Sequence, residues 1–312
     1  MSREGRRRRR MRFWTLWLVP MAGIALLGAA ARGSEDRVSL LPRLQNGETL
    51  RYESHARVNR HVKTKSNVAT MFEPGTVHSD ISSGLRLSIQ EVRLVDKRPM
   101  MAAESDLEPG EQAATGTSAS PPQPKVNFTV GENGDVTRAD GLDDLDPEQR
   151  LVWQFWIAQF AFGWTLPATG VKPGEKWKSV EEEKTPTPIA KLEWERETTY
   201  VQNDKCPIIP GEQCAVLLIS ATLKQRSKPD DTTPEDYRLH ELKTSGVAKG
   251  TNETVLYISL KTGLLLRATE DIQQSLDVTI AKADGSNQVQ YQIDVTSHFE
   301  TVFVPAGNST AH

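Results

Sequence analysis

The residues best placed to do chemistry together are four aspartates that lie close to one another: Asp140, Asp143, Asp144 and Asp146. Carboxylate oxygens are ligands that calcium accepts, but the spacing of a calcium-binding loop and its closing glutamate are missing. A carboxylate just before a helix can instead cap the free backbone N–H groups and interact favourably with the helix dipole. We interpret the cluster as helix capping, with a calcium site as the less favoured alternative, and we predict no metal site.

The histidines do not form a pattern typical of catalysis. His55 and His61 would share one face of a strand, but at the usual rise they lie about 20 Å apart, too far to share a metal. His78 precedes Ser79 and Asp80, yet neighbours in sequence do not have the geometry of a catalytic triad. The chain has no GxSxG elbow, phosphate-binding glycine loop, HExxH pair or dinucleotide fingerprint. We therefore expect no catalytic residue and no cofactor, and we predict that the protein is not an enzyme.

The two cysteines, Cys206 and Cys214, are separated by seven residues that include Pro207, Pro210 and Gly211. These three residues bend the segment and bring its ends together. A redox motif would have two intervening residues, and a metal site would need further Cys or His, which are absent within twenty residues. An even count of cysteines favours a structural disulfide, provided that the compartment is oxidising.

One segment has the signals of a helix over about 147–163. Asp146 can cap it, Pro147 suits the first helical position, and Gln149 can reach back to the cap. Gly163 can end the helix. Apolar residues cover nearly its whole circumference, so we expect it to be buried on more than one side.

Aromatic residues are concentrated in this helix, because six of the fifteen Trp and Phe residues lie between Trp153 and Trp164. Two interpretations are open. In the first, Trp153, Trp156 and Phe160 form an ordinary core stripe. In the second, these residues and Trp164 line an apolar cavity and bind a ligand, since pockets of that kind hold lipids and other apolar molecules.

The remaining pattern is mostly of period two, which indicates strands with one buried and one solvated face. Alternation is clear over 276–280 and 289–295, and it changes phase near Gln90-Glu91, which suggests a β-bulge. Asn133-Gly134 and Asp284-Gly285 are typical of tight hairpin turns. The predicted fold class is mainly β (α+β): a curved antiparallel sheet or half-barrel with one buried aromatic helix.

Two segments lack such a pattern. Residues 98–125 are rich in Ala, Glu, Ser, Thr, Gly and Pro, so we predict a disordered insert there. Residues 226–236 are predicted to form a shorter polar loop. Strand patterns resume on either side of both, which favours a single β-rich domain over 32–312.

Residues 1–31 resemble a signal peptide. Five consecutive arginines, Arg6 to Arg10, precede an apolar stretch from Phe13 to Leu27, and Ala29–Ala31 supplies the small residues of a cleavage site. A permanent membrane anchor is the alternative, but a spanning helix needs ~20 apolar residues. We therefore predict a periplasmic or secreted protein with no integral membrane segment after cleavage.

Cleavage changes the charge of the chain. The segment holds seven arginines and one glutamate, a net of +6, so a chain of −3 becomes −9. An acidic chain of this kind is not expected to bind nucleic acid or anionic membrane surfaces.

Four further features of the sequence support a resemblance to a protein family. They are the opening strand from Gly47-Glu48 to Tyr52, the aromatic helix, the stretch 166–177 and the turn within 260–265. Together with the export signal they resemble a family of uncharacterised bacterial exported β-rich proteins. The architecture is also similar to the half-barrel of periplasmic lipoprotein carriers, which implies lipid binding by analogy of fold. The chain lacks a lipid-attachment cysteine after its apolar segment, so stable membrane tethering is not expected.

Two hypotheses of function follow. The first is a non-catalytic exported protein that binds a lipid or another apolar ligand between the curved sheet and the aromatic helix. The alternative is a structural or protein-interaction module of the cell envelope, with a solid core and no ligand cavity. The sequence indicates no particular protein partner.

Overall fold

Alternating apolar and polar residues build the long strands. In β1, Leu50, Tyr52 and Ala56 are buried, whereas the intervening Arg51 and Glu53 are exposed. The computed structural model describes residues 37–66, 74–109, 124–183 and 187–306. The strands are β1 (Thr49–Ser66), β2 (Gly75–Val95), β3 (Arg98–Pro109), β4 (Lys125–Val130), β5 (Val136–Asp140), β6 (Lys176–Glu182), β7 (Leu192–Lys205), β8 (Gln213–Gln225), β9 (Leu242–Ser259), β10 (Leu265–Lys282) and β11 (Val289–Phe303).

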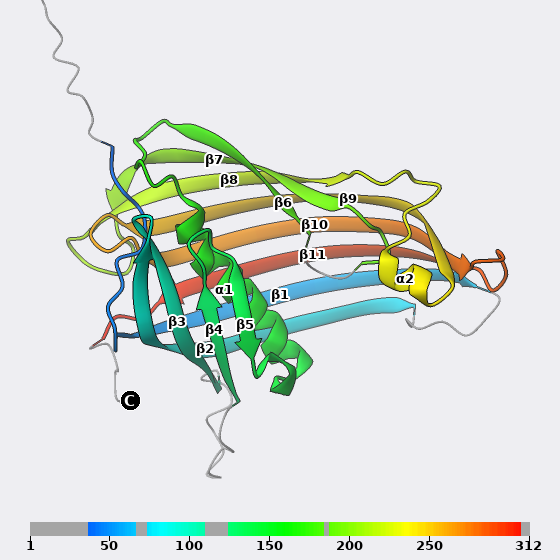
Figure 1. Cartoon of the computed structure of the whole chain (residues 1–312), viewed down its shortest axis with the longest axis horizontal. Helices are drawn as coiled ribbons and strands as arrows, with labels where there is room; N and C mark the ends of the chain where they lie inside the picture. The colour runs from blue at the N-terminus through cyan, green and yellow to red at the C-terminus, as the bar shows by residue number, and fades with distance from the viewer. Residues whose placement is uncertain (1–36, 67–73, 110–123, 184–186, 307–312) are drawn as a thin grey trace, which may run out of the picture. The chain divides into compact units, whose positions relative to one another are not determined.

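These strands form one open antiparallel sheet in the order β5-β4-β3-β2-β1-β11-β10-β9-β8-β7-β6. Two runs of sequential hairpins, β1 to β5 and β6 to β11, meet where β1 pairs with β11. Figure 1 shows the long strands side by side, with β3, β4 and β5 beside the helix α1 (Pro147–Thr165). The predicted fold class, a curved antiparallel sheet with one buried aromatic helix, is confirmed.

The helix α1 begins as its sequence predicts. The Asp146 side chain accepts hydrogen bonds from the backbone N–H groups of Glu148 and Gln149, each 2.9 Å long, and the Gln149 side chain completes the capping box. Asp143 and Asp144 lie in a single 3-10 turn, Leu142–Asp144, just before the helix. The helix continues two residues beyond the predicted end at 163. At that end Arg98 Nη1 donates a 2.6 Å hydrogen bond to the Trp164 carbonyl.

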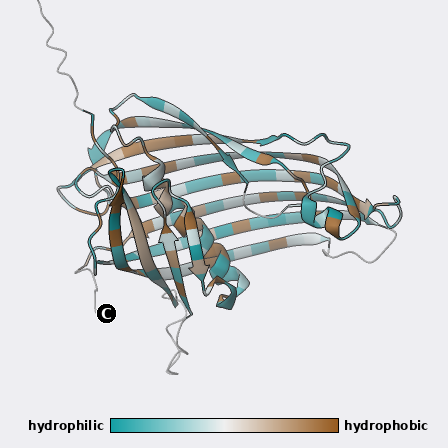
Figure 2. Ribbon diagram, in the orientation of Figure 1, coloured by the Kyte–Doolittle hydropathy of each residue, from teal (hydrophilic) through white to brown (hydrophobic). Residues whose placement is uncertain are grey.

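We call the sheet face that carries α1 the inner face. Figure 2 shows hydrophobic and hydrophilic residues alternating along the strands, as expected when one face is buried and the other solvated. One buried cluster surrounds α1, and a second lies beside it around Leu217 and Leu256. A third, around Trp194 and Tyr291, lies near the other end of the strands and is called the far cluster. A short helix, α2 (Glu235–Leu239), contacts β9.

The disordered insert predicted at 98–125 is wrong over much of its length. Residues 98–109 form β3, which pairs with β2 throughout, and Lys125 begins β4. Met101, Ala103 and Leu107 alternate along β3 and are each 1% exposed, so the strand does bury an apolar face. Small and polar neighbours hide that alternation in the sequence. Residues 110–123 lie outside the described residues.

Several local predictions are confirmed. The register shifts between Ile89 and Glu91, as a bulge there requires. Gly134 has a φ of 84° in the turn that joins β4 and β5, a conformation that favours glycine. Gly285 occupies the turn between β10 and β11 with a φ of 82°. The polar loop predicted at 226–236 is shorter than expected, because Glu235 begins α2.

The predicted signal peptide, residues 1–31, lies outside the described residues, so its cleavage stays a prediction. Among the residues that are described, none of the helices combines the length and hydropathy needed to cross a membrane.

Cys206 and Cys214 form the predicted disulfide across the turn between β7 and β8, with their Cα atoms 5.0 Å apart. Replacing both cysteines by alanine should lower the free energy of unfolding by about 2.5 kcal/mol, because the unfolded chain regains the entropy of the open loop. Denaturant unfolding of the two proteins measures this difference. Equal stabilities, or two titratable thiols in unreduced protein, would contradict the prediction.

Candidate functional site

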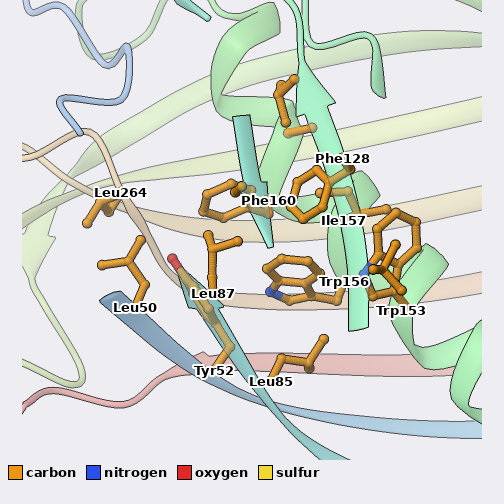
Figure 3. Close-up of a cluster of buried hydrophobic side chains, with 14 of the residues drawn as sticks. Leu50, Tyr52, Leu85, Leu87, Phe128, Trp153, Trp156, Ile157, Phe160 and Leu264 are labelled. Carbon is orange, nitrogen blue, oxygen red and sulfur yellow. The ribbon is translucent and has the colours of Figure 1, made fainter. Parts of the chain in front are cut away.

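The four aromatic residues predicted to bind a ligand are packed inside the protein. Trp156 and Trp164 are fully buried, and Trp153 and Phe160 are each 2% exposed. Figure 3 shows Trp153, Trp156 and Phe160 among side chains from the sheet, including Tyr52 and Phe128. The structure therefore makes these residues part of the core, whereas their role in ligand binding stays a prediction.

Two of these residues attach α1 to β3. Trp153 Nε1 donates to Ser105 Oγ at 2.8 Å, and Trp164 Nε1 donates to the Pro99 carbonyl at 2.8 Å. Buried indole N–H groups need such partners, because an unmet donor costs free energy. The aromatic helix and β3, which the sequence pattern did not predict to be a strand, thus stabilise each other.

Tyr52 of β1 holds the centre of this cluster. Its ring centroid lies 5.9 Å from that of Trp156, 5.8 Å from that of Phe160 and 5.5 Å from that of Phe303. Its hydroxyl donates to the Leu265 carbonyl at 3.2 Å. Burial raises the pKa of the Tyr52 phenol far above its usual value, so the side chain is neutral. The sequence reasoning noted Tyr52 only as part of an opening strand.

Another side of α1 faces β10 and β11. Phe155 is half-buried and stacks on Phe299, with ring centroids 3.4 Å apart and planes inclined by 17°. One turn further on, Gln159 Nε2 donates to Glu270 Oε2 at 3.0 Å. Asn252 Nδ2 donates to Glu270 Oε1 at 2.5 Å. A carboxylate of the inner face is thus held by two amide groups, one from the helix and one from β9.

Further polar side chains of the inner face extend from Asn252 toward β7 and β6. Asn252 lies opposite Ala221, and Ala221 lies opposite Arg196, whose guanidinium donates to the Glu181 carboxylate. Burial lowers the pKa of Arg196, and the Glu270 charge acts in the opposite direction. We call Gln159, Glu181, Arg196, Asn252 and Glu270 the polar network. The sequence reasoning missed it, because its members are spread over five elements.

Between the cluster around α1 and the far cluster, apolar side chains of the inner face remain accessible. Ile272 packs against both clusters and is itself half-buried. Val77 is 48% exposed. We call this set the inner strip; its members come from β1, β2, β10 and β11 and are Val58, Val77, Ile81, Ile272, Ile293 and Val295. It borders the polar network, because Ile272 lies opposite Asn252.

The outer face is polar and holds four of the histidines. His55 Nε2 lies 2.5 Å from Asp80 Oδ1, and His298 Nδ1 lies 2.8 Å from Asp271 Oδ1. Within the described ranges, no three His, Cys, Asp or Glu side chains gather as a metal site would require. A hollow of about 360 Å³ on β2 to β5 is lined partly by Arg93, Met100 and Thr129. Around these histidines the outer face therefore offers paired charges.

Comparison with known proteins adds no family to this description, since neither a protein-family model nor a curated protein matches the chain. The site is thus defined by its geometry alone: an accessible apolar strip beside a polar network, next to a buried aromatic core.

Replacing a core aromatic residue by alanine tests whether the aromatic core is fully packed. Trp156→Ala should lower the free energy of unfolding by about 3–5 kcal/mol, as is usual for large aromatics in packed interiors. Phe155→Ala, from the half-buried side of the same helix, is the control and should cost clearly less. Denaturant unfolding measures both. If Trp156→Ala costs no more than Phe155→Ala, the residue lines an open cavity.

Proposed function

We propose that this protein is an exported, non-catalytic binding protein that holds an apolar ligand on the inner strip. One observation carries the proposal. The strip lies between two buried clusters on the face that elsewhere forms the core, yet its side chains keep accessible surface. Apolar surface in such a position favours an apolar partner, because burying it gains roughly 25 cal/mol per Å² removed from water.

The side chains beside the inner strip are suited to fix the orientation of a bound ligand. Phe155 is half-buried on the α1 side of the strip and supplies a stacked ring. The polar network, which includes Glu270 opposite Phe299, supplies amide, carboxylate and guanidinium groups. Ligand sites commonly combine an apolar lining with a few polar groups that fix orientation. In this proposal the ligand contacts the strip and Phe155, rather than the buried Trp156 and Phe160.

Two features support export. The arginine-rich start and the apolar stretch of residues 1–31 have the order of a secretory signal. The Cys206–Cys214 disulfide suits an oxidising compartment such as the periplasm or the exterior of the cell.

The alternative, an interaction module of the envelope, is favoured by a different observation. On the outer face of β8 and β9, Val216 lies opposite Tyr257 and Leu218 lies opposite Val255. Leu218 is 40% exposed, so this group of apolar residues is available to a protein partner. An interaction module of this kind would use the outer face and would leave the inner strip without a ligand.

A neutral fluorescent dye tests the ligand proposal. N-phenyl-1-naphthylamine should bind purified protein saturably, and Val295→Thr should weaken that binding about fivefold, because burying a hydroxyl costs roughly 1 kcal/mol or more. Val247→Thr is the matched control: Val247 is 41% exposed and lies next to the inner-facing Ala248 on β9. It should leave the dye affinity unchanged.

Two results would contradict the proposal. The first is the absence of saturable dye binding by the parent protein. The second is an equal effect of Val295→Thr and Val247→Thr, which would mean that the dye does not distinguish the two faces.

The export claim has its own test. Protein recovered from the envelope fraction should begin near Arg32, because Ala29–Ala31 provides the small residues that a signal peptidase needs. N-terminal sequencing measures this directly. An intact Met1, or a chain that only detergent extracts from membranes, would contradict cleavage.

A further inference from the structure

An arginine stands in the middle of the inner strip. Arg60 of β1 lies opposite Val77 on β2 and opposite Val295 on β11. Val58 and Val62 are two residues away on the same strand and face the same side, because strand side chains alternate. The four nearest side chains around this cation on the inner face are therefore all valines.

The next-nearest positions on the two adjacent strands hold no carboxylate either. The diagonal positions around Arg60 on the two adjacent strands are Gly75, Ser79, Ile293 and Ser297. Such neighbours lie about 7–8 Å away, within reach of a long side chain, but none of these is acidic. Among the described residues, Arg60 makes no hydrogen bond or ion pair, although its side chain is exposed.

Several other arginines of the sheet have acidic partners. Arg86 is paired with Asp106 at 2.7 Å, and Arg267 is paired with Glu300 at 2.7 Å. On the inner face itself, Arg196 is paired with Glu181. Arg60 thus differs in combining three properties: it lies on the inner face, its neighbours are apolar, and it has no acidic partner within the described part of the chain.

We propose that Arg60 binds the carboxylate of a single-chain amphiphile, a long-chain fatty acid, whose hydrocarbon chain lies on the inner strip. The inference rests on the proposed function and names its ligand class. A guanidinium matches a carboxylate in a fork-to-fork pair of charge-assisted hydrogen bonds. The surrounding valines keep part of that pair away from water, which strengthens it.

The dimensions of the sheet agree with this arrangement. Neighbouring strands lie about 4.8 Å apart, and residues two apart on one strand lie about 6.6 Å apart. Gln274 lies opposite Val295 on β10, and Ile272 is two residues further along that strand, so Ile272 is about 12 Å from Arg60 across β11. A chain that starts at Arg60 can therefore pass Val295 and run diagonally to Ile272. Phe155 stacks on Phe299 of the same neighbouring strand, at the α1 end of the strip. The head and the chain of the ligand are thus matched by different, adjacent parts of one face.

A simpler role for Arg60 is that of a solvated charge that keeps an apolar face from aggregating. The two roles make different predictions. A solvating charge only needs to be charged, and its removal should not change the affinity for an acid relative to a neutral molecule. A carboxylate-binding arginine discriminates between molecules that share a chain and differ in the head group.

The experiment compares hexadecanoate with hexadecanol in competition against N-phenyl-1-naphthylamine, on the full chain at pH 8 and below micelle concentrations. The parent protein should prefer hexadecanoate. Arg60→Gln should weaken hexadecanoate binding about tenfold or more, since hydrogen bonds to charged groups are among the strongest. It should leave hexadecanol and dye binding unchanged. Arg57→Gln is the matched control, because Arg57 is an exposed arginine of the same strand on the outer face.

The outcomes separate the two proposals. No dye binding by the parent protein overturns the proposed function itself. Dye binding without preference for the acid, or equal effects of Arg60→Gln and Arg57→Gln, overturns only the role of Arg60. Flotation with phosphatidylglycerol vesicles adds a third result: binding to these vesicles that Arg60→Gln removes would assign Arg60 to a membrane surface and overturn the free fatty acid as ligand.

Discussion

The pairing of β1 with β11 is the constraint on which the rest of this structure depends. It runs without interruption from Tyr52 opposite Phe303 to Ser66 opposite Val289 and joins the first described strand to the last. Without it, the two runs of hairpins would be separate sheets, each with an additional open edge. The pairing also places Phe303 against Tyr52, and Tyr52 and Phe299 in turn contact aromatic rings of α1.

A mismatch of lengths then explains why part of the inner face stays accessible. At 1.5 Å per residue, the nineteen residues of α1 make a helix about 28 Å long. At about 3.3 Å per residue, the eighteen residues of β1 span about 60 Å. A single helix is too short to cover such a sheet. The far cluster covers another part of the inner face, and the inner strip lies between the two.

Features determined by neighbouring residues could be predicted from the sequence. The capping box at Asp146, the bulge after Ile89 and the turn at Gly134 each depend on a few consecutive residues. The disulfide was also predictable, because the chain has only two cysteines and they lie close together.

Features determined by strand register could not be predicted. The strand β3 has too few large apolar residues to be recognised alone, and it is held by its partners β2 and β4 and by the indole of Trp153. The polar network unites residues of α1, β6, β7, β9 and β10, and the ring of valines around Arg60 appears only once β2 and β11 are aligned with β1. From the sequence, the aromatic helix was the candidate ligand site. In the structure its tryptophans are buried in the core, and the accessible apolar surface is the inner strip.

The accessibility of the inner strip is the central claim, and paramagnetic NMR tests it most directly. A neutral spin-labelled hydrocarbon such as 10-doxylnonadecane broadens the signals of methyl groups that it contacts, without involving any charged residue. The account predicts selective broadening of the methyl signals of Val58, Ile272 and Val295, with those of Val247 and Leu218 on the outer strand faces unaffected. Broadening confined to Val247 and Leu218, or no selective broadening at all, would contradict it.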